Sequence, residues 1–197
     1  MRDIVKFENF LNEDDCNSLN KWTDFAAENE ILGKGLHPKL VNGLNYTKRL
    51  NTRKFSDSTV YPEIVYKIYD NITEFLNLHH LPRGVAGGGR DGVVVSLTYP
   101  GGDLHEHVDP KEPHGEVLRC NILTRKPTSG GVLYVNDHKV NLEVGELHCY
   151  LPSMLPHRFT EVSGDISRVM WMFSYQISLE QFEEFVKENK EASRPLY

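Results

Sequence analysis

Residues 93–109 read Val-Val-Val-Ser-Leu-Thr-Tyr-Pro-Gly-Gly-Asp-Leu-His-Glu-His-Val-Asp. The stretch opens with a β-branched apolar run, which favours a strand, and continues through Pro-Gly-Gly, which is typical of a turn. It closes on His107 and Asp109, two residues apart at the expected end of a strand. Residues i and i+2 of a strand point to the same face, so a nitrogen donor and an oxygen donor can converge there on one cation. The stretch therefore predicts both a strand-rich fold and a candidate metal-binding pair.

The pattern of the chain changes near residue 90. Beyond that point, short runs rich in Val, Leu, Tyr and Phe alternate with turn signals. Several short strands at this spacing predict an all-β sandwich or barrel. The expected strands are Val93–Tyr99, Leu118–Thr124, Gly131–Val135, His138–Leu142, Glu146–Leu151 and Arg168–Ile177.

The part of the chain before residue 92 is expected to supply helices and loops. Asn12, with Asp15 three residues later, resembles a capping box, and the helix that follows is expected to end near Asn29. Pro62 suits the first position of a second helix, and an apolar stripe predicts that this helix spans residues 62–77.

The remaining segments complete a single predicted domain over residues 1–197. A short strand is expected over 4–10 and a closing helix over 179–189. Residues 31–58 are expected to form a long loop or short irregular strands, and 78–92 a linker or mobile loop. The fold class is therefore mainly β with flanking helices. We divide the domain into helical support and loops (1–91), a β core (92–178) and a C-terminal helix and tail (179–197).

Composition narrows the class of protein. The chain has 197 residues, 39% hydrophobic and 25% charged, which is ordinary for a globular domain. The net charge of −6 argues against a duplex nucleic-acid binder, whose usual footprint is basic. Cys16, Cys120 and Cys149 are odd in number and widely spaced, so they predict neither a disulfide framework nor a thiolate zinc site. With no apolar run near membrane-spanning length, we expect a soluble cytoplasmic protein.

Two further residues extend the candidate metal site. His157 lies at the expected start of a later strand, and Arg168 opens the last strong strand eleven residues further on. Two His and one carboxylate form the facial triad of non-heme Fe(II) oxygenases, which leaves three metal positions free. Two of these can chelate a 2-oxo acid, and an arginine fork suits its far carboxylate. The face that Arg168 shares with two methionines favours an anion partner for it.

An alternative metal site uses His105, which precedes His107 by two residues and shares its expected face. With Glu112 it would form a cupin-like pattern, although the Gly and Pro spacing of that pattern is missing. The commoner fate of such a histidine is support of a metal ligand or solvent exposure. A non-catalytic, cupin-like metal-binding module therefore stays open as an alternative.

The order His107-x-Asp109, His157, Arg168 in a late β-rich half resembles the Fe(II)- and 2-oxoglutarate-dependent oxygenase superfamily. The nearer resemblance is to its prolyl 4-hydroxylase-like branch, carried by residues 92–177. The motifs are Tyr99-Pro-Gly-Gly, Ser129-Gly-Gly-Val-Leu-Tyr, Val144-Gly-Glu-Leu-His-Cys-Tyr-Leu-Pro and Leu155-Pro-His157-Arg-Phe.

The resemblance implies a double-stranded β-helix, or jelly roll, with iron at its mouth. It implies that His107, Asp109 and His157 bind iron, that Arg168 binds 2-oxoglutarate, and that the Tyr99 hydroxyl also reaches this cosubstrate. Arg119-Cys-Asn121 is similar to the Arg-x-His of the aspartyl/asparaginyl β-hydroxylase branch, so Asn121 is a candidate donor to the C1 carboxylate. The chain departs from the patterns in having Arg168 where many prolyl hydroxylases have Lys, and Met170 where other members have Ser.

The implied reaction is hydroxylation of a substrate C–H with release of succinate and CO2. The implied cofactors are Fe(II), 2-oxoglutarate and O2, with ascorbate as a stimulant. We expect a protein or peptide substrate, proline by resemblance, and neither a membrane nor a nucleic-acid partner. An oxygenase for a small molecule or nucleobase is the alternative. Because water must be kept out of such a site, residues 31–58 and 78–92 are candidate lids.

Overall fold

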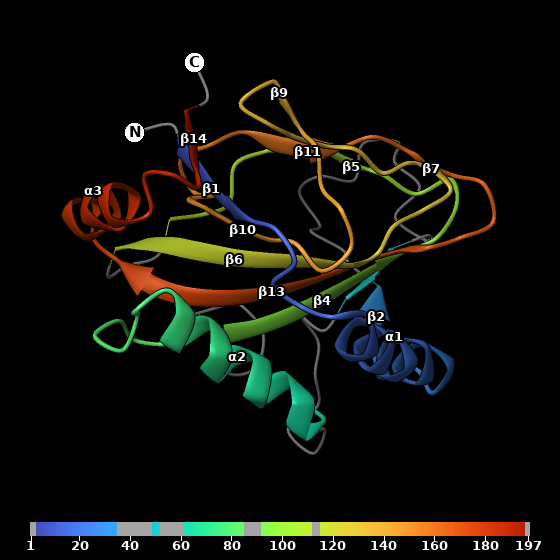
Figure 1. Cartoon of the computed structure of the whole chain (residues 1–197). Coiled ribbons are helices and arrows are strands. Elements are labelled where there is room, and N and C mark those ends of the chain that lie inside the picture. Colours follow the sequence, from blue (N-terminus) through green and yellow to red (C-terminus); the bar gives the residue numbers. More distant parts are fainter. Residues whose placement is uncertain (1–2, 35–48, 52–60, 85–91, 112–114, 196–197) are drawn as a thin grey trace.

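The computed structural model of the chain describes residues 3–34, 49–51, 61–84, 92–111 and 115–195. Two antiparallel sheets face each other, and two helices cover the outer face of the larger one (Figure 1). The helices are α1 (Glu13–Glu28), α2 (Glu63–Phe75) and α3 (Leu179–Glu188). This arrangement confirms the prediction of a mainly β fold with flanking helices.

The larger sheet has the strand order β14-β1-β10-β6-β13-β4-β3-β2. In chain order its strands are β1 (Asp3–Phe7), β2 (Gly33–Lys34), β3 (Arg49–Asn51), β4 (Val93–Thr98), β6 (Glu116–Arg125), β10 (Leu147–Tyr150), β13 (Arg168–Ile177) and β14 (Ser193–Pro195). Because β1, β2, β3 and β14 join it, the sheet extends beyond the expected core of residues 92–178.

The facing sheet has the order β5-β11-β8-β9, and a two-stranded sheet pairs β12 with β7. Their strands are β5 (Leu104–His107), β7 (Ser129–Gly130), β8 (Leu133–Val135), β9 (His138–Val140), β11 (His157–Phe159) and β12 (Val162–Ser163). All six are two to four residues long. The strands β5 and β11 were not among the six predicted strands, although His107 and His157 were expected at strand ends. All six predicted strands are present with bounds shifted by a few residues at most.

The central strand β13 shows how the sequence divides the two faces of the larger sheet. Val169, Trp171, Phe173 and Tyr175 point to the helices and are fully buried in the main core. The alternate positions, beginning with Arg168, point to the facing sheet, as the period of two in a strand requires. One face therefore supplies stability, and the other is available for polar groups.

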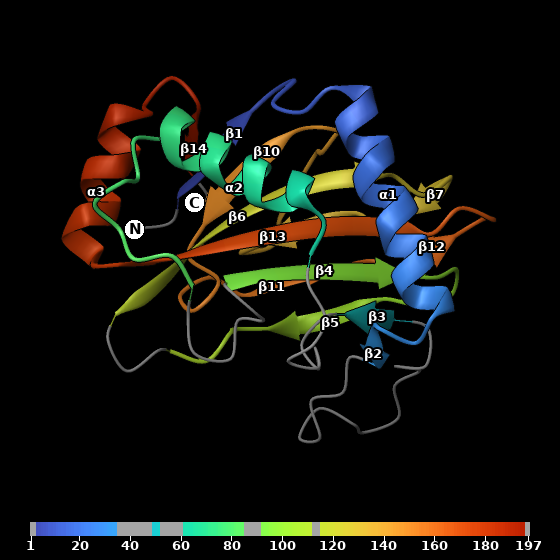
Figure 2. The same ribbon diagram turned by 90° about the horizontal axis from the view of Figure 1, so that it is seen from below.

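The two predicted N-terminal helices pack on the apolar face of this sheet (Figure 2). Asn12 caps α1 by accepting from the backbone N–H of Asp15 at 2.9 Å, as predicted. The ring of Trp22 in α1 lies 5.5 Å from that of Trp171. Pro62 stands at the N-cap of α2 and not at its first helical position, a difference of one residue.

The segments predicted as loops and lids lie mostly outside the described residues. Within residues 31–58, β2 pairs with β3, and β3 pairs with β4, so the part that is described forms short strands. Within residues 78–92, Arg83 makes an isolated bridge to Tyr175. Among the described residues, no helix is both long enough and apolar enough to cross a membrane.

The N-terminus of α3 offers a test of the capping contribution. The Ser178 hydroxyl accepts from the Gln181 N–H at 3.1 Å, and the Gln181 side chain accepts from the Ser178 N–H at 2.8 Å. We expect Ser178→Ala to lower the free energy of unfolding by about 1 kcal/mol, measured by denaturant titration. The control is Ser18→Ala, on the exposed side of α1, which is expected to change it by less than about 0.5 kcal/mol. Equal effects of the two changes would contradict the capping assignment.

Candidate metal centre

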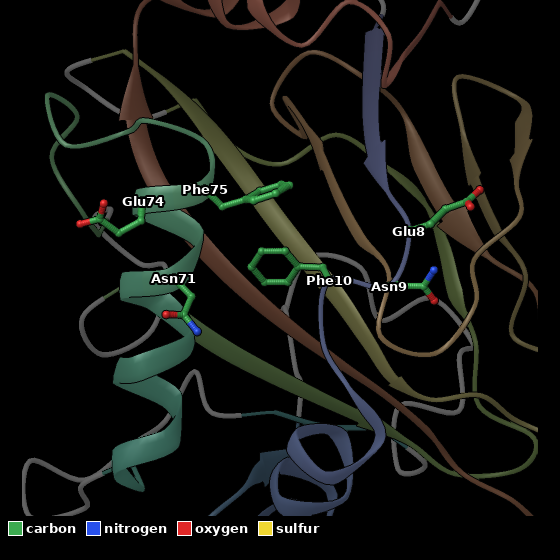
Figure 3. Close-up of a pocket in the computed structure, with 6 residues that line it drawn as sticks. All are labelled: Glu8, Asn9, Phe10, Asn71, Glu74 and Phe75. Carbon is green, nitrogen blue, oxygen red and sulfur yellow. The ribbon is translucent and has the colours of Figure 1, made fainter.

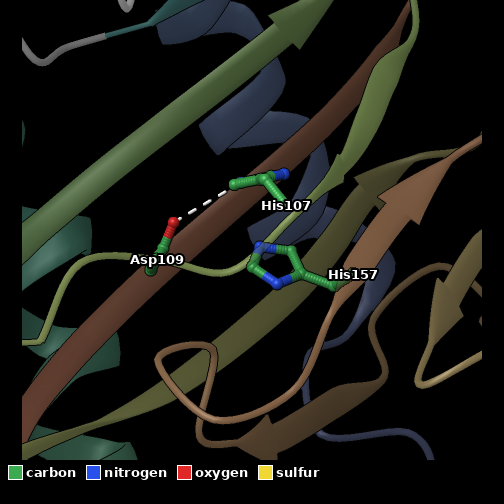
Figure 4. A group of neighbouring side chains, drawn as sticks. All are labelled: His107, Asp109 and His157. Carbon is green, nitrogen blue, oxygen red and sulfur yellow. Dashed lines mark ion pairs between the residues drawn. The ribbon is translucent and has the colours of Figure 1, made fainter. Parts of the chain in front are cut away.

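The pairing of β5 with β11 brings two histidines together. His107 and His157 are register partners in this antiparallel pair, and their ring centroids are 4.2 Å apart. Asp109 follows β5 by two residues, and its N–H donates to the Pro152 carbonyl at 2.9 Å. One donor atom from each of the three residues lies within 4.8 Å of the other two (Figure 4). The structure therefore brings together the three residues that the sequence analysis selected.

Backbone carbonyls orient both imidazoles. His107 Nδ1 lies 2.8 Å from the His105 carbonyl, and His157 Nδ1 lies 3.0 Å from the Leu155 carbonyl. A carbonyl only accepts, so each Nδ1 is the donor, and Nε2 is the ring nitrogen that remains to bind a metal. Burial, followed by the nearby His107, lowers the pKa of His157 to about 4. The neutral form is the one that ligates cations.

The two oxygens of Asp109 have different neighbours. Oδ1 lies 3.4 Å from His107 Nε2, and Oδ2 accepts from Arg119 Nη2 at 3.2 Å. Both side chains are largely buried, with exposed fractions of 13% for Asp109 and 8% for Arg119. The donor set of two imidazole nitrogens and one carboxylate oxygen fits a facial triad for Fe(II).

Arg168 is a buried guanidinium at the start of β13. Its Nε donates to the Gly131 carbonyl at 3.1 Å, and its guanidinium carbon lies 4.6 Å from the centroid of the Phe159 ring. Within the described ranges it forms no ion pair with a carboxylate. Burial, followed by the nearby Arg49, lowers its pKa to about 10, so it stays charged. A buried cation without a carboxylate partner is suited to bind an anion.

The inward face of the larger sheet carries further polar groups beside these residues. Asn121 Nδ2 contacts His148 Nε2 at 3.2 Å, and burial, then Arg168, lowers the pKa of His148 to about 3. Asn121 Oδ1, His148 Nδ1 and Arg119 Nε are buried without a hydrogen-bond partner in the described part of the chain. Unpartnered buried polar atoms are costly, and a polar ligand between the sheets would satisfy such groups.

Tyr99 is a correction to the predicted site. It follows β4 directly, and its side chain is 39% exposed. Leu97, two residues earlier in β4, packs in the helix-side core, and the period of two gives Tyr99 the same direction. Thr98, the residue before it, is the register partner of Arg168 and takes the inward direction. Tyr99 therefore points away from the metal-ligand cluster.

Three other residues were candidates for the site or for the alternative cupin-like site. Asn121 is buried and contacts His148, and its predicted contact with the C1 carboxylate of the cosubstrate stays a prediction. His105 is exposed and lies 3.5 Å from Asp103, outside the cluster. Glu112, its suggested cupin partner, lies outside the described residues.

Tyr150 is a neighbour of the cluster that the sequence analysis missed. Its ring is buried and lies edge-on to His157, with centroids 5.6 Å apart. Burial, then Asp109, raises its pKa well above the usual value, so the hydroxyl stays protonated. The alternation along β10 places His148 and Tyr150 on one face, and this signal could have identified both.

A surface hollow of about 490 Å³ lies elsewhere, between α2 and the segment after β1 (Figure 3). It is lined by Glu8, Asn9, Phe10, Asn71, Glu74 and Phe75. Phe10 and Phe75 make an aromatic contact there, with centroids 5.3 Å apart. The lining includes none of the three cluster residues.

Solved structures share the fold at low sequence identity. No family model matches the chain, and no curated protein matches it. A viral collagen prolyl hydroxylase from Paramecium Bursaria Chlorella virus-1, in a 2OG complex, is 15% identical with a TM-score of 0.60, covering 89% of this chain and 96% of that one. A Pseudomonas putida prolyl-4-hydroxylase is 15% identical with a TM-score of 0.63, covering 90% and 94%.

Two more structures are similar over most of their length. A prolyl hydroxylase from Trichoplax adhaerens, in complex with a peptide fragment of the hypoxia inducible factor oxygen degradation domain, is 14% identical with a TM-score of 0.66, covering 93% and 86%. HygX from Streptomyces hygroscopicus, with nickel and 2-oxoglutarate bound, is 11% identical with a TM-score of 0.57, covering 89% and 83%. The chain therefore has the double-stranded β-helix fold of the Fe(II)- and 2-oxoglutarate-dependent oxygenases, in the form found in prolyl hydroxylases.

Proposed function

We propose that this protein is an Fe(II)- and 2-oxoglutarate-dependent dioxygenase that hydroxylates a peptidyl residue and releases succinate and CO2. The observation that carries the proposal is the convergence of His107, Asp109 and His157 on a fold that also buries Arg168. The three cluster residues would hold the iron. Two similar structures, one a 2OG complex and one with nickel and 2-oxoglutarate bound, support the choice of cosubstrate.

Iron with its 2-oxo acid, when bound, would supply the oxidising chemistry through O2. The side chains of this protein bind and orient. The two carbonyl contacts orient His107 and His157 so that Nε2 of each ring can face the metal. Arg168, set in β13 and held by Gly131, would bind the far carboxylate of the diacid. The apolar wall beside it, which includes Phe159 and Met170, would limit the access of water.

The substrate class rests on the likeness in fold. Three of the similar structures are described as prolyl hydroxylases, and the one from Trichoplax adhaerens holds a peptide fragment. We therefore assign a peptidyl side chain, with proline first.

The first prediction concerns the carboxylate ligand. Asp109→Ala removes the oxygen donor, and we expect stoichiometric Fe(II) binding and succinate formation to be lost. The measurement is anaerobic Fe(II) titration followed by a succinate assay. Asp103→Ala is the matched control, because Asp103 is half exposed and faces His105, away from the cluster. Ordinary Fe(II) affinity in Asp109→Ala would exclude this residue as a ligand.

The second prediction concerns the cosubstrate. A charge-assisted hydrogen bond contributes about 1.5–3 kcal/mol, so Arg168→Ala is expected to raise the 2-oxoglutarate concentration needed for half-maximal turnover about 10- to 100-fold. Arg158→Ala is the control, because this arginine lies over the Tyr134 ring and is half buried. An unchanged 2-oxoglutarate titration in Arg168→Ala would remove this residue from the site.

The third prediction tests the substrate class. We expect succinate to form above the background rate with members of a proline-containing peptide library, and mass spectrometry to find a product 16 Da heavier. Free proline, other free amino acids and nucleobases are the comparison substrates, under the same Fe(II), ascorbate and O2 conditions. Turnover of a free small molecule without any hydroxylated peptide would overturn the peptidyl assignment and leave the oxygenase assignment in place.

A further inference from the structure

A carboxylate such as that of Asp109 can bind a metal through one or both of its oxygens. The two oxygens of Asp109 have different neighbours. Oδ1 faces the histidine cluster, 3.4 Å from His107 Nε2. Oδ2 accepts from Arg119 Nη2 at 3.2 Å and faces the larger sheet. Arg119 thus holds the oxygen that points away from the two histidines.

Arg119 is held firmly in the position from which it makes this contact. It lies in the middle of β6, between its register partners Tyr150 in β10 and Ser174 in β13. Its side chain is 8% exposed, and Nη1 contacts the Met172 sulfur at 3.7 Å. The neighbouring strands set the backbone of Arg119, and burial with the sulfur contact restricts its guanidinium beside Asp109.

The coordination mode of the carboxylate matters for the proposed chemistry. Three ligands that each give one atom leave three positions of an octahedron free, which suffices for two oxygens of a 2-oxo acid and for O2. A carboxylate that binds through both oxygens takes a fourth position. The 2-oxo acid and O2 would then compete for the two that remain.

We infer that Arg119 is a positioning residue that holds Asp109 as a one-oxygen ligand and so keeps open the metal position that the 2-oxo acid needs. The inference rests on the proposed function. Outer contacts of this kind orient metal ligands, and their loss typically changes metal affinity or activity about 10- to 100-fold. Here the change is expected in the binding of the 2-oxo acid and not in the binding of the metal.

A simpler role for Arg119 would be to neutralise a buried carboxylate. The two roles make different predictions. If Arg119 only neutralises charge, its removal weakens metal binding or the fold itself, because an unpaired buried charge is costly. If it sets the coordination mode, the metal still binds, because Oδ2 is released to join Oδ1, while chelation by the 2-oxo acid becomes weaker.

The experiment compares two neutral variants, Arg119→Met and Arg119→Gln, with wild type. Metal affinity is measured with Mn(II) by the loss of the free-ion EPR signal. Chelation is measured by anaerobic titration of the Fe(II) form with 2-oxoglutarate, through the visible charge-transfer band of the chelate. We expect Mn(II) affinity within about threefold of wild type, or tighter, and 2-oxoglutarate binding weaker by about 10- to 100-fold.

Two further variants sharpen the comparison. Arg119→Lys keeps a cationic donor for Oδ2 and is expected to recover most of the 2-oxoglutarate affinity. Arg125→Met is the matched control, because Arg125 lies on the same strand and pairs with Asp24 of α1 on the opposite side of the sheet. It is expected to change neither titration.

Each possible result of these titrations either supports or contradicts the role of Arg119 as a positioning residue. The inference fails if the neutral variants bind 2-oxoglutarate as wild type does, or if they lose Mn(II) and 2-oxoglutarate together. It also fails if both neutral variants unfold, because Arg119 would then be holding the sheet and not the carboxylate. If wild type binds Fe(II) yet shows no band with 2-oxoglutarate, the proposed function itself is wrong, which is a separate result.

Discussion

The antiparallel pairing of β5 with β11 is the contact on which the site depends. These strands have four and three residues, yet their register sets His157 directly opposite His107. A slip by one residue would turn one imidazole to the other face of the sheet, because the side-chain period of a strand is two. The same pairing fixes the backbone from which Asp109 projects. Two short strands thus decide whether His157 meets the distant pair His107 and Asp109.

The larger sheet supports this arrangement with two faces of opposite character. Its helix side is a continuous apolar core around Trp171 and Phe173, to which α2 adds side-chain hydrogen bonds from Tyr69 and Thr73. Its inner side buries Arg119, Asn121, His148 and Arg168, several of them with unpartnered atoms. Each such atom costs about 1–3 kcal/mol when nothing binds it. The apolar face stabilises the fold enough to hold a polar interior that is arranged for a ligand.

Much of the fold could be predicted from local patterns. The period of two in Arg168–Ile177 and the apolar stripe after Pro62 are strong signals, and both elements formed where they were expected. The strands β5 and β11 carry no comparable signal, because each is short and polar and exists only through its partner. The predicted position of Tyr99 came from the resemblance of a motif and not from the strand period. The strand period points Thr98, and not Tyr99, to the inner face of the sheet.

The sequence by itself determined which side chains could form the site. The chemistry of a metal triad is present in His107, Asp109 and His157, and that of an anion-binding group in Arg168. The strand period also predicted that His107 and Asp109 point to the same side. Only the tertiary structure decided that these side chains meet, that Arg119 takes one oxygen of Asp109, and that Tyr150 lies beside His157. The physical reason is that strand register and the facing of two sheets depend on hydrogen bonds and packing between segments far apart in the chain. A local pattern specifies which face a residue takes, but not what lies opposite that face.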